Sequence, residues 1–458
     1  MDGKPLWMHV CTQIDEWDDA KNPQFLLFVD GKVTQGVDMN HRDILLDRCA
    51  KGGQKYRLEL QSYTGILHTE FNLIVDLREI DPEIEGLYYD MVVPLEAFPR
   101  LEEDGKARRD LENVLNEAVN LIDLRTPYNE SFYQSIAAAR RYLAKALYTD
   151  LAGHEEVIAS CIGHTHIDVA WWWTVAQTRE KVCRSFATVL KLMDEYPNYK
   201  FMSSQPQLYY FLKQRYPELY EQIKQRVAEG RWEPEGGMWV EADCNLTSGE
   251  SLVRQFLFGY SGALPQIMAK CGIDYFMTTK LAWNQFNKMP YDTFKWRGID
   301  GTEILTHLVT TLGVGQSEND FFTTYNGILH PDALIGGWHR YQQKDINNDI
   351  LISYGYGDGG GGPTRAMLET STRMEKGIEG LPKVRQAFAR TYFDELAERV
   401  KDNRRLPTWE GELYFEYHRG TYTSMARNKR SNRKIELHMM DLELLSLLAQ
   451  AKVAYPEA

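Results

Sequence analysis

Two histidines and an aspartate follow a short apolar run at alternate positions, and these residue types could hold a metal ion. His164, His166 and Asp168 come directly after residues 157–162, a run that is apolar enough to form a strand buried on both faces. In an extended chain, side chains at i, i+2 and i+4 point to one face, so the three would converge at the carboxyl end of the strand. Imidazole nitrogen and carboxylate oxygen are ligands that zinc accepts. The alternative is a polar loop whose histidines only cap neighbouring backbone.

Further carboxylates and another histidine follow other predicted strands. A run at 232–243 ends in Glu241 and Asp243, a second run opens onto a glycine-rich loop with Asp358 at its rim, and a third precedes His418. Four consecutive glycines let a backbone come close to a ligand. The loop lacks the GK[ST] ending of a phosphate loop, which argues against a nucleotide. Each residue alone could be an ordinary loop residue, but their shared position at strand ends points to one site.

The elements that must position these residues alternate between strands and helices. Helical periodicity is found at 175–193, 206–216 and 217–229, and a continuous helical stretch runs from 249 to about 272 with no strand inside it. The predicted strands lie at 157–162, 200–204, 232–243, 274–280, 303–311, 349–354 and 408–417. Such alternation predicts an α/β fold, either a βα barrel or a doubly wound sheet.

The chain divides into four predicted parts: an N-terminal β-rich domain at 1–103, a helical linker at 104–150, the βα catalytic domain at 151–423, and the start of a helical bundle at 424–458. In the first part, a hairpin turn is expected at Asp30-Gly31, and further strands at 56–65, 73–80 and 87–95. The last part is a long amphipathic helix whose apolar stripe needs partners, so we expect the sequence to be a piece of a longer one.

Composition describes a globular chain of 458 residues, with 43% hydrophobic and 12% aromatic residues, which suggests two or three domains. The formal net charge of −13 argues against nucleic acid or an anionic membrane as a partner. Six scattered cysteines without a CxxC pair predict free thiols in a reducing compartment. With no signal peptide pattern and no membrane-spanning run, we expect a cytoplasmic protein, and a homo-oligomer is compatible with the sequence.

Four motifs resemble those of the glycoside hydrolase family 38 α-mannosidases, in the bacterial and cytosolic branch: GHTHIDVAWWW, GGMWVEADCNLTSGESLVRQ, GYGDGGGGPT and GELYFEYHRGTYTS. The resemblance runs through most of residues 1–458. It implies a seven-stranded βα barrel and zinc-dependent retaining hydrolysis. The implied substrate is an α-mannoside or a mannose-containing oligosaccharide, cleaved through a covalent mannosyl-enzyme intermediate.

The resemblance also implies roles for individual residues. His166, Asp168, Asp243 and His418 match the Zn²⁺ ligands of the family, and Asp243 matches the nucleophile as well. Trp171 resembles the tryptophan that stacks under the sugar. A neighbouring Zn²⁺ would keep the carboxylate of Asp243 ionised, as a nucleophile must be.

The second carboxyl group of the reaction is less firmly indicated. Retaining glycosidases need two carboxyl groups about 5–5.5 Å apart, one as nucleophile and one as general acid. The acid must hold a proton near neutral pH, so its pKa should be raised. Asp358 is our candidate for this acid, with Glu241 and Glu412 next.

The chain departs from the family at Phe258-Gly259-Tyr260. Family members carry a further segment there, which ends in a strand and an Asp-containing turn, whereas QFLFGYSGALPQ joins the flanks directly. We therefore expect a gap in the barrel beside Asp243. The resemblance also implies that the family continues beyond residue 458 with a helical bundle and β-domains.

Two other functions are compatible with these residues. The first is a catalytically impaired relative that binds sugar or metal without turnover. The second is a metal-dependent amidohydrolase, whose first strand also ends in HxH. That class needs further strand-end histidines, and His307 and His418 are the plausible ones.

Overall fold

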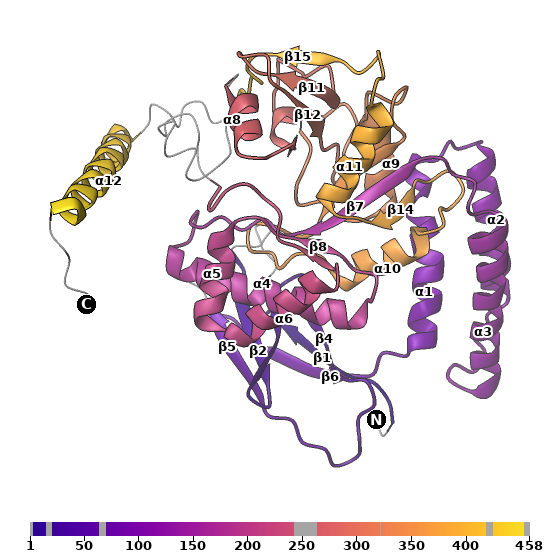
Figure 1. Ribbon diagram of the computed structural model, residues 1–458. Coiled ribbons are helices and arrows are strands. Elements are labelled where there is room, and N and C mark those ends of the chain that lie inside the picture. The colour runs from indigo at the N-terminus through magenta and orange to yellow at the C-terminus, as the bar shows by residue number, and fades with distance from the viewer. Residues whose placement is uncertain are drawn as a thin grey trace.

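The computed structural model describes residues 3–14, 21–63, 70–241, 263–320, 322–417 and 425–452. The predicted ligands Asp243 and His418 and the junction at 258–260 lie outside these ranges. The described chain has a mixed α/β fold: N-terminal strands lie at one end, a parallel sheet in the middle, and a second mixed sheet at the other end (Figure 1).

The N-terminal strands form two antiparallel three-stranded sheets. Their orders are β4-β1-β6 and β3-β2-β5. The bounds are β1 Leu6–Cys11, β2 Gln24–Val29, β3 Lys32–Val37, β4 Asp43–Asp47, β5 Leu58–Tyr63 and β6 Ile74–Arg78. Asp30 and Gly31 join β2 to β3 with φ values of 51° and 78°, the left-handed backbone that a tight hairpin requires. The predicted hairpin and the strands near 56–65 and 73–80 are therefore confirmed.

The prediction of a strand at 87–95 is wrong, because these residues belong to helix α1, Pro82–Leu95. Asp81 caps the helix by accepting hydrogen bonds from the backbone N–H groups of Glu83 and Ile84, and proline occupies the first helical position. Leu87 and Met91 lie one turn apart and pack into the main core, so tertiary packing outweighs the β-prone valines and tyrosines.

The residues predicted to form a helical linker, 104–150, contain two helices. They are α2 Lys106–Asn120 and α3 Glu130–Lys145, and α3 continues into a short π-helical turn, η3 Ala146–Asp150. Leu111 and Ala118 are buried on one face of α2, whereas Leu121 lies just past its end and is exposed. The linker packs against α1 at one side of the molecule (Figure 1).

The central sheet is parallel and is built around one buried strand. Its strands are β7 Ile158–His164, β8 Phe201–Met202, β9 Trp232–Glu233, β13 Asp349–Tyr354 and β14 Lys383–Gln386. Strand β7 pairs with β13 along one edge. Along the other edge, its first residues pair with β14 and its last two with β8. The apolar run after residue 156 is thus a central strand, buried on both faces as predicted.

Several strands are shorter than predicted. In the described part of the run predicted at 232–243, which ends at residue 241, only β9 forms a strand. Gly236 follows it with a φ of +148° and comes so close to Ser204 that an added Cβ would lie 2.5 Å from the Ser204 Cβ. The helices that follow these strands are α4 Val175–Glu195, α5 Pro206–Arg215, α6 Pro217–Ala228, α9 Pro331–Arg340, α10 Arg365–Met374 and α11 Ala389–Val400. Helix α4 also packs against β2 and β3, which joins the N-terminal sheets to the centre.

A second, mixed sheet has the order β10-β12-β11-β15. Its strands and neighbouring helices are α8 Leu264–Lys270, β10 Tyr275–Thr278, η4 Lys280–Ala282, β11 Thr293–Arg297, β12 Glu303–Leu308 and β15 Thr408–Glu410. Ile162 and Met202 of the central sheet share a buried apolar cluster with Val309 and Tyr392 between the two sheets. Among the described strands the two sheets stay separate and do not close into a ring, so the barrel remains a prediction.

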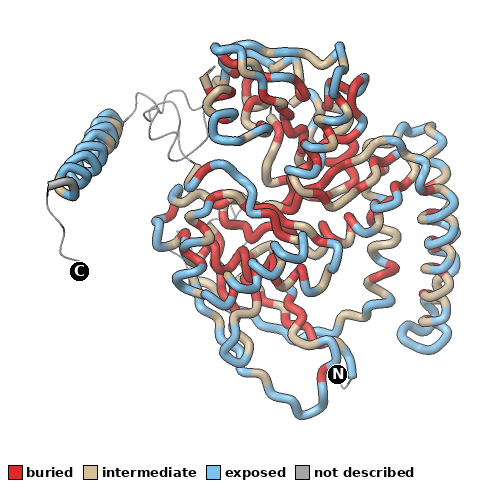
Figure 2. Tube along the Cα trace, viewed as in Figure 1, coloured by how far each residue is buried: buried red, intermediate tan, exposed pale blue. Residues whose placement is uncertain are grey.

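The last described element is α12, Ala426–Lys452, which stands apart from the other elements (Figure 1). Its apolar residues, including Leu437, Leu444 and Leu447, are exposed (Figure 2). The helix itself matches the prediction. No helix among the described residues combines the length and the apolar character needed to cross a bilayer.

Candidate metal centre

The loop after β7 carries the first two residues of the candidate site. The side chain of Ile167 is fully buried, so His166 and Asp168 on either side of it point the other way, as alternation predicts. His166 Nε2 lies 3.3 Å from Asp168 Oδ1. His164 does not join them, because its Nδ1 lies 3.4 Å from the carbonyl oxygen of Met202 on the neighbouring strand β8. Desolvation lowers its pKa to about 4.

Asp358 completes a three-residue group that could hold a metal ion. It follows β13 on the glycine-rich loop, and its backbone N–H donates to the carbonyl oxygen of His166 at 2.7 Å. One ligand atom each from His166, Asp168 and Asp358 lies within 4.8 Å of the others. One imidazole nitrogen and two carboxylate oxygens suit a divalent ion such as zinc. The residue types of this group therefore fit the predicted metal.

The electrostatics of this group favour positive charge. Burial by itself lowers the pKa of His166, but the carboxylates of Asp168, Glu241 and Asp358 outweigh it and raise that pKa to about 9. Glu241 Oε2 lies 3.6 Å from His166 Nδ1, and Ser204 Oγ donates to Glu241 Oε1 at 2.9 Å. Burial raises the pKa of Asp358, while the neighbouring His166 lowers it. Three carboxyl groups around one imidazole form a site suited to a cation.

Lys280 and Tyr325 border the group and were missed by sequence reasoning. Lys280 Nζ lies 4.1 Å from the ring centroid of Trp283 and 4.4 Å from that of Tyr325. The Tyr325 ring is 4.7 Å from the ring of His166. Burial lowers the pKa of Lys280, while the carboxylates of the site act in the opposite direction. Lys280 lies just after the end of β10, so the rule that chemistry gathers at strand ends could have found it.

Trp171 presents an aromatic face close to the loop of His166. It is 48% exposed, and its ring centroid lies 5.1 Å from that of Trp172 and 5.6 Å from that of the buried Trp173. Trp173 Nε1 donates to the carbonyl oxygen of Asp168 at 3.2 Å, which ties this aromatic segment to the metal group. An exposed ring in this place could stack on a sugar.

His307 does not belong to the site. It is fully buried on β12, where its Nδ1 lies 2.9 Å from Thr293 Oγ1 and 3.3 Å from the hydroxyl of Tyr392. Burial lowers its pKa to about 3, so the ring is neutral and structural. The amidohydrolase alternative thereby loses one of its two candidate histidines.

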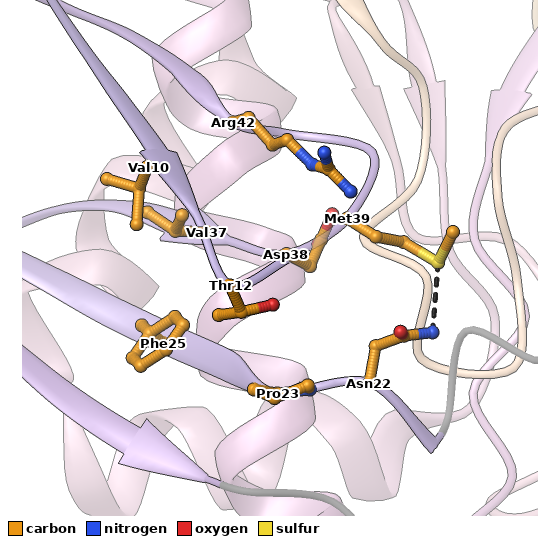
Figure 3. A pocket seen from close by; sticks show the side chains of 9 residues that line it. All are labelled: Val10, Thr12, Asn22, Pro23, Phe25, Val37, Asp38, Met39 and Arg42. Atoms are coloured by element: carbon orange, nitrogen blue, oxygen red, sulfur yellow. Dashed lines mark hydrogen bonds between the residues drawn. The ribbon is translucent and has the colours of Figure 1, made fainter. Parts of the chain in front are cut away.

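A small cavity in the N-terminal domain is lined by residues of β1, β2 and the segment after β3, with Asp38 and Arg42 at one side (Figure 3). Its volume is about 10 Å³. A single water molecule needs about this much space, so no sugar fits there. Asn22 Nδ2 donates to Met39 Sδ at 3.1 Å across the opening.

Comparison with known families decides the relationship. The family described as "Glycosyl hydrolases family 38 N-terminal domain" matches residues 156–259 and 257–412, more than half of the chain. The chain belongs to glycoside hydrolase family 38. The two matched segments of this family 38 chain meet at 257–259, where the sequence predicts the shortened junction. A second description, "Alpha mannosidase middle domain", matches residues 416–458.

Relatives of this family 38 chain include "Alpha-mannosidase G" of Dictyostelium discoideum, 35% identical over 81% of this chain and 34% of that protein. "Alpha-mannosidase 2C1" of Homo sapiens is 36% identical over 84% of this chain and 37% of its own length. The chain thus spans about a third of the length of these relatives. Among solved structures, an alpha-mannosidase from Enterococcus faecalis V583 aligns with a TM-score of 0.43 and 19% identity, over 56% of this chain and 31% of that chain.

Proposed function

We propose that this chain carries the catalytic centre of a zinc-dependent retaining α-mannosidase, acting on terminal mannose of α-mannosides or oligosaccharides. The observation that carries the proposal is the group of His166, Asp168 and Asp358, whose ligand atoms lie within 4.8 Å of one another in a family 38 chain. The site has the donor types that zinc prefers and an excess of carboxylates that favours a cation.

In this proposal His166 and Asp168 hold the ion together with Asp243 and His418, the two ligands that lie outside the described residues. When bound, zinc supplies Lewis-acid stabilisation and orients the sugar hydroxyls. The exposed ring of Trp171, close in sequence to Asp168, stacks under the sugar in this proposal.

Two carboxyl groups carry out the proposed bond cleavage. The Asp243 carboxylate attacks the anomeric carbon and forms the mannosyl-enzyme intermediate, while the Asp358 carboxyl gives its proton to the departing oxygen. Asp358 then takes a proton from the water that releases mannose from Asp243. Burial raises the pKa of Asp358, and this supports its role as the proton donor.

The test is hydrolysis of an aryl α-mannoside by the purified chain before and after treatment with a chelator. We expect turnover that the chelator abolishes and that added Zn²⁺ restores. Turnover that persists without metal would contradict the proposal, as would hydrolysis with inversion of the anomeric configuration.

A second candidate is a relative that binds metal and sugar without turnover. The meeting of the two matched segments at 257–259 favours it, because a shortened connection there would leave a gap near Asp243. Binding of Zn²⁺ and mannose with no detectable aryl mannoside hydrolysis would support this candidate. The first proposal also includes the seven-stranded barrel and a cytoplasmic location. A cytoplasmic location agrees with the free thiols of the described cysteines, which are Cys11, Cys49, Cys161, Cys183 and Cys271.

A further inference from the structure

The glycine-rich loop that carries Asp358 is held by side chains of the N-terminal sheets, more than 300 residues away in sequence. Gln24 Nε2 donates to the carbonyl oxygen of Gly359 at 3.0 Å, and Asn40 Nδ2 donates to that of Gly360 at 3.2 Å. His41 Nε2 lies 2.9 Å from the carbonyl oxygen of Pro363. We propose that Gln24, Asn40 and His41 are positioning residues of the metal centre; this inference rests on the proposed function.

Gln24 has its amide orientation fixed by two cations of helix α4. Its Oε1 accepts hydrogen bonds from Lys181 Nζ at 3.2 Å and from Arg184 Nη2 at 2.6 Å. Because a flipped amide would turn its own N–H₂ group toward these cations, Nε2 must face the loop. Gln24 is 1% exposed, so the bond to Gly359 is made without competition from water.

His41 is fixed by acceptors on both sides of its ring. Its Nδ1 lies 2.9 Å from Asp38 Oδ1, opposite the contact of Nε2 with Pro363. Both contacts are made to acceptor oxygens, so the ring is held from its two sides. Asp38 Oδ1 also accepts the backbone N–H of His41 at 2.9 Å, which fixes the carboxylate in turn.

The glycines of the loop serve this contact with the protein itself. Gly361 has a φ of +89°, and a Cβ there would lie 2.4 Å from Asp38 Oδ2 and 2.6 Å from His41 Nδ1. At Gly359, with a φ of +94°, a Cβ would lie 2.5 Å from Lys181 Nζ. The close approach expected of these glycines is therefore made to the N-terminal domain and α4, whereas Asp358 contacts His166 and Asn326.

The same loop fixes the backbone of a predicted metal ligand. The Asp358 N–H donates to the carbonyl oxygen of His166, and Thr165 Oγ1 donates to the carbonyl oxygen of Tyr356 at 3.0 Å. Movement of the loop would thus displace His166 as well as Asp358. Contacts that orient metal ligands from outside typically contribute about 10-fold to 100-fold in metal affinity.

The test compares Gln24→Glu with the parent chain. The new carboxylate keeps both acceptor contacts to Lys181 and Arg184, so the melting temperature should not fall. The substitution replaces the N–H₂ group of Gln24 by a carboxylate oxygen, which repels the carbonyl oxygen of Gly359. Amide hydrogen exchange should therefore become faster in peptides covering 355–362. Affinity for Co²⁺, measured by titration calorimetry, should fall about tenfold.

Gln61→Glu is the matched control, because Gln61 also joins the N-terminal sheets to α4, through a 3.2 Å bond to Glu180, but does not touch the loop. It should leave loop exchange and Co²⁺ affinity as in the parent. Asn40→Ala removes a second hydrogen-bond donor to the loop. It should change loop exchange and Co²⁺ affinity in the same direction as Gln24→Glu, so the test still stands if one of the two variants fails to fold.

Loop exchange and Co²⁺ affinity that stay at parental values in folded Gln24→Glu and Asn40→Ala would overturn the inference. Faster exchange with unchanged affinity would overturn it too, since the contacts would then hold the loop without positioning the centre. If the parent itself binds no Co²⁺, the proposed metal function fails, whereas the exchange data still show whether these residues hold the loop.

Discussion

Asp358 has two possible roles, general acid and metal ligand, because its carboxylate lies close enough to His166 and Asp168 to share an ion with them. In Asp358→Asn, hydrolysis of an alkyl α-mannoside should slow by about 100-fold to 10,000-fold, since the departing oxygen receives no proton. An activated aryl mannoside, whose leaving group needs no proton, should be affected much less. Steady-state rates on the two substrates give the comparison.

The zinc affinity of the same variant separates the acid from a ligand. If Asp358 acts as the acid, its replacement should change the Zn²⁺ affinity little, because His166 and Asp168 remain to bind the ion. A loss as large as that of Asp168→Asn would instead make Asp358 a ligand. Equal slowing on both leaving groups would contradict the acid role.

His307 should make folding stability depend on pH. Burial lowers the pKa of His307 in the folded chain to about 3. Below about pH 6.5 the imidazole of His307 is therefore protonated in the unfolded chain but stays neutral in the folded chain. Stability is therefore complete above this pH and falls as the pH drops toward the folded value. Between pH 7.5 and 5, urea unfolding should show the parent losing about 2 kcal/mol more than His307→Gln. Equal losses in the two proteins would contradict this account of His307.

The residues of the site differed in how well the sequence predicted them. His166 and Asp168 were expected from alternation after a buried strand, and the structure brings Asp358 to them as strand-end placement suggested. His164 was expected to join them and does not, because it is the last residue of β7 and its ring contacts the backbone of β8. Lys280 is the last residue of a predicted strand but has no motif around it, so its approach to the site depends on packing that no local pattern encodes.

Among the elements, the glycine-rich loop gives a prediction about packing. Gly361→Ala should destabilise the fold by about 3 kcal/mol, from left-handed backbone strain plus the clash with Asp38 and His41. Gly301→Ala is the control: Gly301 has a φ of +87° with nothing within 4 Å of an added Cβ, so it should cost only about 1 kcal/mol. Free energies of unfolding from urea titrations measure both. Equal losses would show that the close contact contributes nothing.

Element types were predictable where local signals agreed, and failed where they conflicted. The Asp30-Gly31 hairpin and helix α4 combine turn or capping chemistry with the right periodicity. In α1, aromatic and β-branched residues suggested a strand, although Asp81 and the following proline form a helix start. Strand β14 was not predicted, because its four residues gain their strand conformation from pairing with β7.

At the scale of the whole molecule, the α/β class was predictable from alternation, but the described strands form separate sheets, so the barrel remains a prediction. Inserting the family segment at the junction at 258–260 should raise aryl mannoside turnover by about a hundredfold, since a nucleophile misplaced by about 1 Å loses on this order. Insertion of a glycine-serine segment of equal length is the control and should give no gain. Full activity in the unmodified chain would show that the segment is dispensable.

The most direct test of the metal centre is the zinc content of the purified chain after equilibration with Zn²⁺ and removal of the excess. The parent should retain one Zn²⁺ per chain, and His166→Ala and Asp168→Ala should each lose most of it while keeping the helical content of the parent. Retention of one Zn²⁺ per chain in both variants, or of none in the parent, would contradict a metal centre at these residues.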